Sequence, residues 1–246
     1  MPHHRLAVAA ALVAGLLAAL RPARAYEPTW ESISTRPVPT WFRTMKFGIF
    51  IHWGVYAVPA WRCGRVDEWT DWYRWELEGE DPANNECLRN WHEAQYGPGA
   101  PYTVFADMFK AELYNATEWA RLIDLSGANY VVFTTKHHDG WANWPTAAAP
   151  GWNSGDVGPR RDIVGELAEA LRALARPIRL GLYHSLVEWF NPLYLADREA
   201  NTTTYPDQVL QPMLRDIVER YKPAVVWADG AAAADHVCIE RCGAGC

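Results

Sequence analysis

The chain has 246 residues, of which half are apolar and 21% are charged, and its formal net charge at pH 7 is −6. This is the composition of a globular protein, and the length suits one barrel domain of roughly 250 residues. The negative charge argues against nucleic acid as a partner, because binding to phosphates needs an excess of Lys and Arg.

Residues 1–25 have the three parts of a secretory signal peptide. Arg5 supplies a positive start, residues 6–20 are an apolar run, and residues 23–25 read Ala-Arg-Ala, an A-x-A cleavage pattern. The apolar run is too short for a membrane span, so we expect none. Cleavage after Ala25 would remove three Arg and no acidic residue, which changes the net charge from −6 to −9. We therefore expect a protein of the secretory pathway, lysosomal or extracellular.

The rest of the chain alternates between strand patterns and amphipathic helix patterns. In chain order, we expect a strand at 46–54, a long irregular connection at 55–102, a helix from 117 to 127, a strand at 129–135, a helix at 162–175, a strand at 178–183, a helix at 207–221 and a strand at 224–227. This order predicts an α/β fold with a parallel sheet, the N-terminal half of a (β/α)8 TIM-type barrel.

The last sixteen residues, 231–246, cannot supply four more strands and helices. Half a barrel leaves two sheet edges without partners. We therefore expect an incomplete chain whose tail is unrelated to the fold. The predicted organisation is a signal peptide at 1–25, a partial catalytic barrel domain at 26–230 and an atypical tail at 231–246.

Two N-glycosylation sequons, at Asn115 and Asn201, agree with secretion. Asn115 also stands where a helix cap is expected, which is a competing structural role. An odd number of cysteines leaves at least one thiol unpaired or intermolecular; the five are Cys63, Cys87, Cys238, Cys242 and Cys246. Cys63 and Cys87 could pair across a loop, but the sequence leaves this open. The last three recur every four residues, either as a metal-binding stripe or, as we prefer, as part of the unrelated tail.

Each predicted strand ends in a polar or aromatic cluster, and the carboxyl ends of barrel strands are where active sites are built. Asp229 is the best candidate for a nucleophile, because it follows a buried strand and Gly230 leaves room for close approach. A carboxylate at this place can attack the anomeric carbon of a sugar and form a glycosyl-enzyme intermediate. The alternative is a turn or helix cap, since Asp-Gly is a common turn.

Histidines also lie at the strand ends: His52, the adjacent pair His137 and His138, and His184. They could form hydrogen bonds with substrate hydroxyls or bind a metal. Metal-dependent barrels often place two alternating histidines on one strand, whereas the first strand here has one. Adjacent residues cannot both face inward along a regular strand. We therefore expect neither a metal nor another cofactor.

Several motifs, in this order, resemble the α-L-fucosidases of glycoside hydrolase family 29, and most closely the animal tissue or lysosomal type. They are KFGIFIHWG at 46–54, the Trp-rich stretch after it, TTKHHDG at 134–140, WNS at 152–154, DVGP at 156–159, GLYHS at 181–185, EW at 188–189 and WADG at 227–230. The resemblance covers residues 28–230. It implies a retaining hydrolase that removes terminal α-L-fucose from glycoproteins and glycolipids.

The resemblance also implies roles for individual residues. Asp229 matches the nucleophile, and the matching fucose-binding residues are His52, His137, His138, Tyr183 and Trp227. A Glu-Trp pair after the first strand also holds the sugar in this family. Residue type favours Glu68 and Trp69, which we assign to this role. The spacing to Gly79 favours Asp71 and Trp72 instead.

The main departure from the family lies after the nucleophile. In the family, the acid/base residue and the later strands follow the nucleophile, and nothing of that region is recognisable here. Asp139 and Glu188 are carboxylates near the strand ends, but we assign neither as the proton donor. The alternative function is therefore a catalytically inactive fucose-binding fragment. The expected partners in both cases are terminal α-L-fucosyl glycans, and a homo-oligomer remains open.

Overall fold

The structure is a computed structural model that describes residues 26–27, 29–64, 69–79 and 85–230. The predicted signal peptide, Glu68 and the predicted tail lie outside the described residues. The chain divides into two units, residues 1–37 and 38–246. The first unit contains the one-turn helix α2 (Trp30–Ser34), whose start is capped by the side chain of Thr29.

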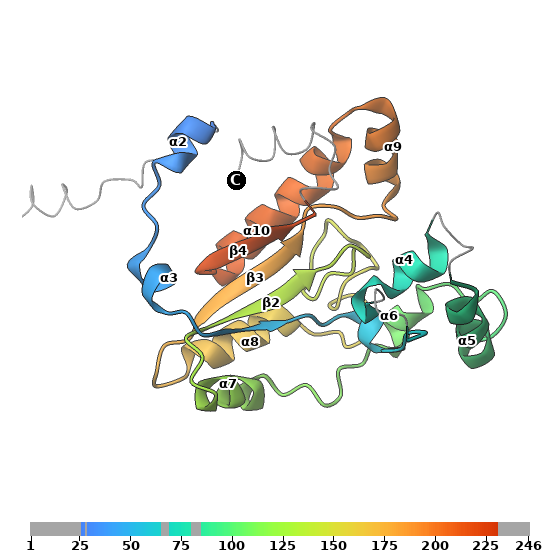
Figure 1. Ribbon diagram of the computed structural model, residues 1–246, viewed down its shortest axis with the longest axis horizontal. Helices are drawn as coiled ribbons and strands as arrows, with labels where there is room; N and C mark the ends of the chain where they lie inside the picture. The colour runs from blue at the N-terminus through green and yellow to red at the C-terminus, as the bar shows by residue number, and fades with distance from the viewer. Residues whose placement is uncertain (1–25, 28, 65–68, 80–84, 231–246) are drawn as a thin grey trace, which may run out of the picture. The chain divides into compact units, whose positions relative to one another are not determined.

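The second unit is built on a four-stranded sheet with the strand order β1-β2-β3-β4 (Figure 1). All three strand pairs are parallel, and the strands are β1 (Gly48–Ile51), β2 (Tyr130–Lys136), β3 (Arg179–Ser185) and β4 (Val225–Asp229). The sequence predicted these four strands to within a few residues, and the parallel α/β arrangement is confirmed. In the sheet, Tyr183 lies opposite Trp227 and Ser185 lies opposite Asp229.

Three helices connect the strands and form a row beside the sheet (Figure 1). They are α7 (Ala116–Leu125), α8 (Ile163–Arg172) and α10 (Gln211–Tyr221), and α8 contacts both of the others. The side chain of Asp162 accepts a hydrogen bond from the amide of Gly165, as an N-cap does. The apolar side chains that recur at helical spacing in α8 are buried, so burial of this face attaches the helix to the sheet.

The connection between β1 and α7 is more ordered than predicted. It contains the short helices η1 (Val55–Ala57), η2 (Thr70–Trp72), α4 (Tyr73–Glu78), α5 (Glu86–Tyr96) and α6 (Val104–Met108). A disulfide bond joins Cys63 to Cys87 within it. Helix-breaking Gly and Pro separate these short segments, so their periodicity is too brief to read from sequence.

Other helical segments flank these main elements. They are α3 (Thr40–Thr44), α9 (Pro192–Ala200) and the π-helical turn η4 (Pro206–Leu210), which leads directly into α10. No helix among the described residues is long and apolar enough to cross a membrane. The central strands β2 and β3 are buried after their first residues. By contrast, Phe50 in β1 and Trp227 in β4 are 40% and 53% exposed.

Candidate active site

Polar side chains from all four strands gather at one edge of the sheet. His52 follows β1, His137 and His138 follow β2, Tyr183 lies in β3, and Asp229 ends β4. Parallel strands end on the same side, so residues far apart in the sequence become neighbours. Five of the side chains that the sequence predicted for one site, those just named, therefore lie at the same end of the sheet.

The carboxylate of Asp229 is held by two hydrogen bonds. The Tyr183 hydroxyl donates to Oδ2 at 2.7 Å, and the Gly230 amide donates to Oδ1 at 2.8 Å. Partial burial works against ionisation, but these two bonds and the nearby histidines lower the pKa of Asp229 below its ordinary value. The carboxylate of Asp229 is thus held in place by its own strand end and by β3, and its ionised form is favoured.

His138 lies next to this carboxylate, with its Nε2 atom 3.6 Å from Asp229 Oδ2. On its other side, Nδ1 lies 2.6 Å from the hydroxyl oxygen of Ser185. The ring stacks on Trp189 at 4.4 Å between centroids. Burial, together with the neighbouring His137, lowers the pKa of His138 to about 3. The ring is therefore neutral at physiological pH.

His52 and His137 form a second polar group with Asp71. His137 Nε2 lies 3.3 Å from Asp71 Oδ2, and the rings of the two histidines are 5.3 Å apart. His52 Nδ1 lies 3.1 Å from the hydroxyl of Thr134, which itself donates to the carbonyl of Ile51. Burial and His137 lower the pKa of His52. Burial opposes ionisation of Asp71, but its bond to His137 holds its pKa below the ordinary value.

The adjacent residues His137 and His138 both face the site, which the strand argument did not allow. Strand β2 ends at Lys136, and its register with β3 shifts between Thr134 and Lys136. The two histidines therefore lie just outside the regular strand, where side chains need not alternate. Their ring centroids are 4.3 Å apart, and each contacts a different carboxylate.

Aromatic rings border these polar groups. Phe50 packs edge-on against Trp227 at 5.2 Å and against Tyr183 at 5.8 Å. Trp72 contacts the His138 ring at 6.0 Å and Trp189 at 4.8 Å. Apolar walls beside a few oriented polar groups are typical of small-molecule sites.

The two candidate positions for the Glu-Trp pair differ in their surroundings. Asp71 contacts His137, and Trp72 contacts the His138 ring, so both residues of this pair adjoin the histidines. Trp69 is 54% exposed, and its ring lies 5.7 Å from the ring of Trp72. Glu68 lies outside the described residues. Asp71 and Trp72, the pair indicated by spacing, thus adjoin the histidines, and the assignment of Glu68 and Trp69 stays a prediction.

Two other carboxylates near the strand ends are engaged in buried structural bonds. Asp139 accepts from the hydroxyl of Tyr102 at 2.7 Å, and burial raises its pKa. Glu188 forms a buried ion pair with Lys136 at 2.7 Å. Both carboxyls are thus engaged by partners behind the site.

Sequence reasoning missed Ser185, and it overvalued His184 as a strand-end residue. His184 is fully buried on the other face, where its Nδ1 lies 2.8 Å from the Thr135 hydroxyl and its ring adjoins Trp144. The alternation of side chains along a strand could have shown this, because Tyr183 and Ser185 must lie on one face of β3 and His184 on the other.

Three of these groups have donor atoms close enough to hold a metal ion. One atom each from His52, Asp71 and His137 lies within 4.8 Å of the others. These three residues come from different segments, unlike the two alternating histidines on one strand that are common in metal-dependent barrels. The same atoms also suit the binding of hydroxyl groups, since imidazole and carboxylate accept their protons.

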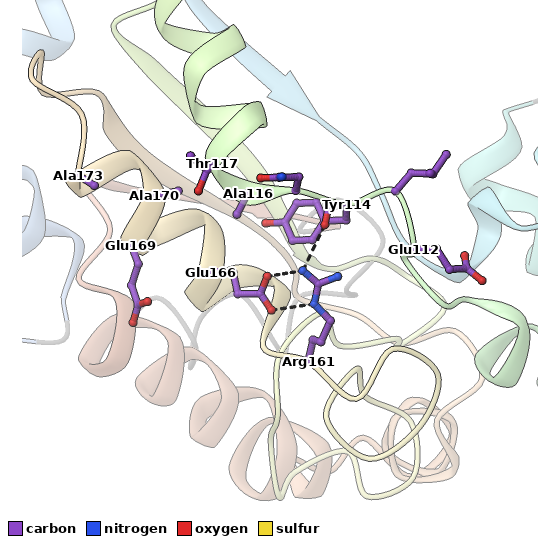
Figure 2. A pocket seen from close by; sticks show the side chains of 11 residues that line it. Glu112, Tyr114, Ala116, Thr117, Arg161, Glu166, Glu169, Ala170 and Ala173 are labelled. Carbon is purple, nitrogen blue, oxygen red and sulfur yellow. Dashed lines mark hydrogen bonds and ion pairs between the residues drawn. The ribbon is translucent and has the colours of Figure 1, made fainter.

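A separate groove lies between the start of α7 and helix α8 (Figure 2). Arg161 crosses it, with an ion pair to Glu166 and a hydrogen bond to the carbonyl of Tyr114. None of the strand-end residues lines this groove. It is therefore distinct from the site built around Asp229.

The fold defines a β/α barrel-type protein, and the candidate site lies at the carboxyl ends of its strands. Residues 16–240 match the family model described as alpha-L-fucosidase, and the chain belongs to this family. The resemblance inferred from the motifs is thereby confirmed. The matched span includes parts of residues 1–25 and 231–246.

Curated relatives agree with this assignment. The tissue alpha-L-fucosidase of Homo sapiens is 48% identical over 212 residues, which are 85% of this chain and 43% of the relative. The alpha-L-fucosidase of Dictyostelium discoideum is 46% identical over 209 residues, or 83% of this chain and 44% of the relative. The chain thus spans less than half the length of these relatives.

Solved structures show the same fold. The alpha-fucosidase of Thermotoga maritima in complex with fucose has a TM-score of 0.75 at 35% identity, covering 89% of this chain and 52% of that protein. An alpha-L-fucosidase from Bacteroides thetaiotaomicron has a TM-score of 0.60 at 27% identity, covering 79% and 41%. The four strands and their helices correspond to about half of such a protein, which confirms the predicted partial barrel.

Proposed function

We propose that this chain provides the nucleophile half of a retaining α-L-fucosidase site. The observation that carries the proposal is the Asp229 carboxylate, which ends a parallel strand and is oriented by Tyr183 and Gly230. Such a carboxylate can attack the anomeric carbon of a terminal α-L-fucosyl group and form a covalent intermediate. Membership of the alpha-L-fucosidase family supports fucose as the sugar.

The remaining groups are suited to hold a neutral deoxy sugar. His52, His137 and Asp71 supply donors and acceptors for hydroxyl groups, while Phe50 and Trp227 supply apolar surface for the methyl group and the apolar ring face. A site built to form hydrogen bonds with hydroxyls rejects sugars that lack them, because its polar groups are then left unpaired. This chemistry supports terminal fucosyl glycans as ligands.

Retention needs a second carboxyl group about 5–5.5 Å from the nucleophile, which acts first as acid and then as base. Among the described residues, the nearby carboxylates of Asp71, Asp139 and Glu188 all form other bonds. We assign no acid/base residue. General acid assistance is typically worth about 10²–10⁴ in rate, so activity depends strongly on this group.

The test is hydrolysis of an aryl α-L-fucoside at acidic pH by the purified chain and by Asp229→Ala. A suitable control is Asp207→Asn, which removes a carboxylate from the turn before α10, away from the strand ends. Activity that is lost only in Asp229→Ala supports the proposal. A folded chain that binds fucose without hydrolysis would instead be a fucose-binding fragment, and a folded chain that neither binds nor cleaves refutes it.

We also propose that the protein passes through the secretory pathway, to the lysosome or the cell exterior. The Cys63–Cys87 disulfide supports an oxidising compartment. The two roles of Asn115 do not compete, since its Oδ1 caps α7 by accepting from Glu118 while N-glycosylation uses Nδ2. Asn201, at the C-terminal end of α9, is exposed.

Expression in a eukaryotic secretory host tests this second proposal. Asn115→Asp keeps the capping oxygen and removes the glycan acceptor, so it should lose one glycan mass without losing stability. Asn201→Asp should lose the other. A secreted protein with no mass change after glycosidase treatment would contradict the glycosylation, and a protein retained in the cytosol would contradict the route.

A further inference from the structure

Ser185 connects two residues of the proposed site. It is the last residue of β3, is fully buried and lies opposite Asp229 in the sheet. Its hydroxyl oxygen lies 2.6 Å from His138 Nδ1 and 2.8 Å from the carbonyl oxygen of Val187. The same oxygen accepts from the Val187 amide at 3.2 Å. The hydroxyl of Ser185 thus lies between a ring nitrogen of His138 and the backbone of Val187.

A serine hydroxyl has one proton, so it cannot donate to both His138 and Val187. If it donates to the Val187 carbonyl, it accepts from Nδ1–H of His138, and both short contacts are hydrogen bonds. If it donates to Nδ1 instead, the Val187 carbonyl loses this donor. The proton on Nε2 then points at Asp229 across 3.6 Å, which is beyond a normal hydrogen bond. In a buried site the first arrangement is favoured, because it pairs more polar groups.

We propose that Ser185 is a positioning residue that holds the proton of His138 on Nδ1, so that Nε2 presents a lone pair beside Asp229. Two acceptors, Nε2 and Asp229 Oδ2, then lie 3.6 Å apart. Two acceptors cannot bond to each other, so the space beside them accepts a group that carries a proton, such as a ligand hydroxyl.

Which hydroxyl of the ligand lies here follows from the proposed chemistry of Asp229, so this step rests on the proposed function. If the Asp229 carboxylate attacks the anomeric carbon, the nearest hydroxyl group of the sugar is the one on the adjacent ring carbon. Hydrogen bonds to this hydroxyl strengthen in the transition state of glycoside hydrolysis. Ser185 would thus set the direction of the hydrogen bond at this position, so that the sugar hydroxyl donates to Nε2, although Ser185 itself does not touch the sugar.

The first test reads the ring directly and needs no ligand. Two-bond proton–nitrogen NMR spectra of the ¹⁵N-labelled chain at neutral pH show which ring nitrogen of each histidine carries the proton, and His138→Gln assigns the signal. We expect His138 to be protonated on Nδ1 in the wild type and in Ser185→Thr, which keeps the hydroxyl. In Ser185→Ala the proton should move to Nε2, toward Asp229.

His92 serves as an internal control for folding. Its Nδ1 bonds to the Tyr73 hydroxyl and its Nε2 lies 2.9 Å from the carbonyl of Ala100, which fixes its tautomer independently of Ser185. Its signal should be the same in all variants. A wild-type His138 protonated on Nε2, or an unchanged His138 signal in a folded Ser185→Ala, would overturn the proposal.

The second test measures binding of L-fucose and of 2-deoxy-L-fucose. We expect the deoxy sugar to bind the wild type about tenfold more weakly, the size of one good hydrogen bond. This ratio should differ from the wild-type value in Ser185→Ala, because the hydroxyl then accepts from Nε2–H instead of donating to Nε2, and it should stay near the wild-type value in Ser185→Thr. The same ratio in wild type and Ser185→Ala would contradict the role in specificity. If L-fucose does not bind at all, the proposed function fails, while the NMR result still decides the tautomer.

Discussion

The two central strands and the two edge strands contribute different kinds of side chain to the site. At the ends of β2 and β3, His138 and Ser185 are buried, and each is oriented by a second contact. At the edges, Phe50 and Trp227 are largely exposed, and the side chain of Asp229 is 45% exposed. The central strands thus supply buried polar groups, whereas the edge strands supply accessible surface and the partly exposed carboxylate of Asp229.

The comparison predicts that core residues behind the site control stability and edge residues do not. Trp144 is fully buried and donates to Asp216, so Trp144→Ala should lower the free energy of unfolding by about 3–5 kcal/mol. Trp227→Ala should change it by no more than about 0.5 kcal/mol, because this side chain is 53% exposed. Urea unfolding of both variants checks this, and equal losses would contradict the distinction.

The buried ion pair behind the site gives a related prediction. Lys136→Met leaves Glu188 buried without its charge partner, which should cost about 3–5 kcal/mol. Arg121→Met breaks an exposed pair on α7 and should cost less than about 1 kcal/mol. The double variant Lys136→Met/Glu188→Leu should regain part of the loss. If Lys136→Met costs no more than Arg121→Met, the ion pair does not hold the strand ends.

The buried histidines should make stability depend on pH. The pKa of His138 is about 3 in the folded protein, against an ordinary value of 6.5, so below about pH 6.5 the unfolded chain binds a proton that the folded chain does not. The free energy of unfolding should therefore fall as the pH decreases from about 6.5 toward 3. Urea unfolding at pH 7 and pH 5 should show a smaller decrease in His138→Gln. An equal decrease in both proteins would contradict the assignment.

The smallest expected effect separates the two candidate Trp residues near the histidines. If the proposed sugar site is correct, Trp72→Ala should weaken L-fucose binding by about tenfold, because Trp72 adjoins the His138 ring. Trp69→Ala should change binding little, because among the described residues the Trp69 ring pairs with Trp72 and with no histidine. Isothermal titration of both variants is the measurement. A larger loss of L-fucose affinity in Trp69→Ala than in Trp72→Ala would favour Glu68 and Trp69 as the sugar-binding pair.

Much of this protein was predictable from its sequence. The strand pattern of buried runs followed by polar clusters predicted four parallel strands, and it placed Asp229, His52, His137 and His138 at the carboxyl ends of these strands, while the family resemblance added Tyr183. These conclusions depend on local periodicity and on the rule that parallel strands end together. The order of several distinct motifs also indicated the family, which the family match confirms.

Only the tertiary structure decided how the side chains at the carboxyl ends of the strands pair with one another. The register shift after Thr134 turns both His137 and His138 toward the site, and sequence spacing does not reveal such a shift. The contact between Asp71 and His137 joins residues that are far apart in the chain. The same holds for Ser185 and His138, whose hydrogen bond depends on strands brought together by folding. Local sequence fixes which face a residue is on, whereas its partner depends on the packing of distant segments.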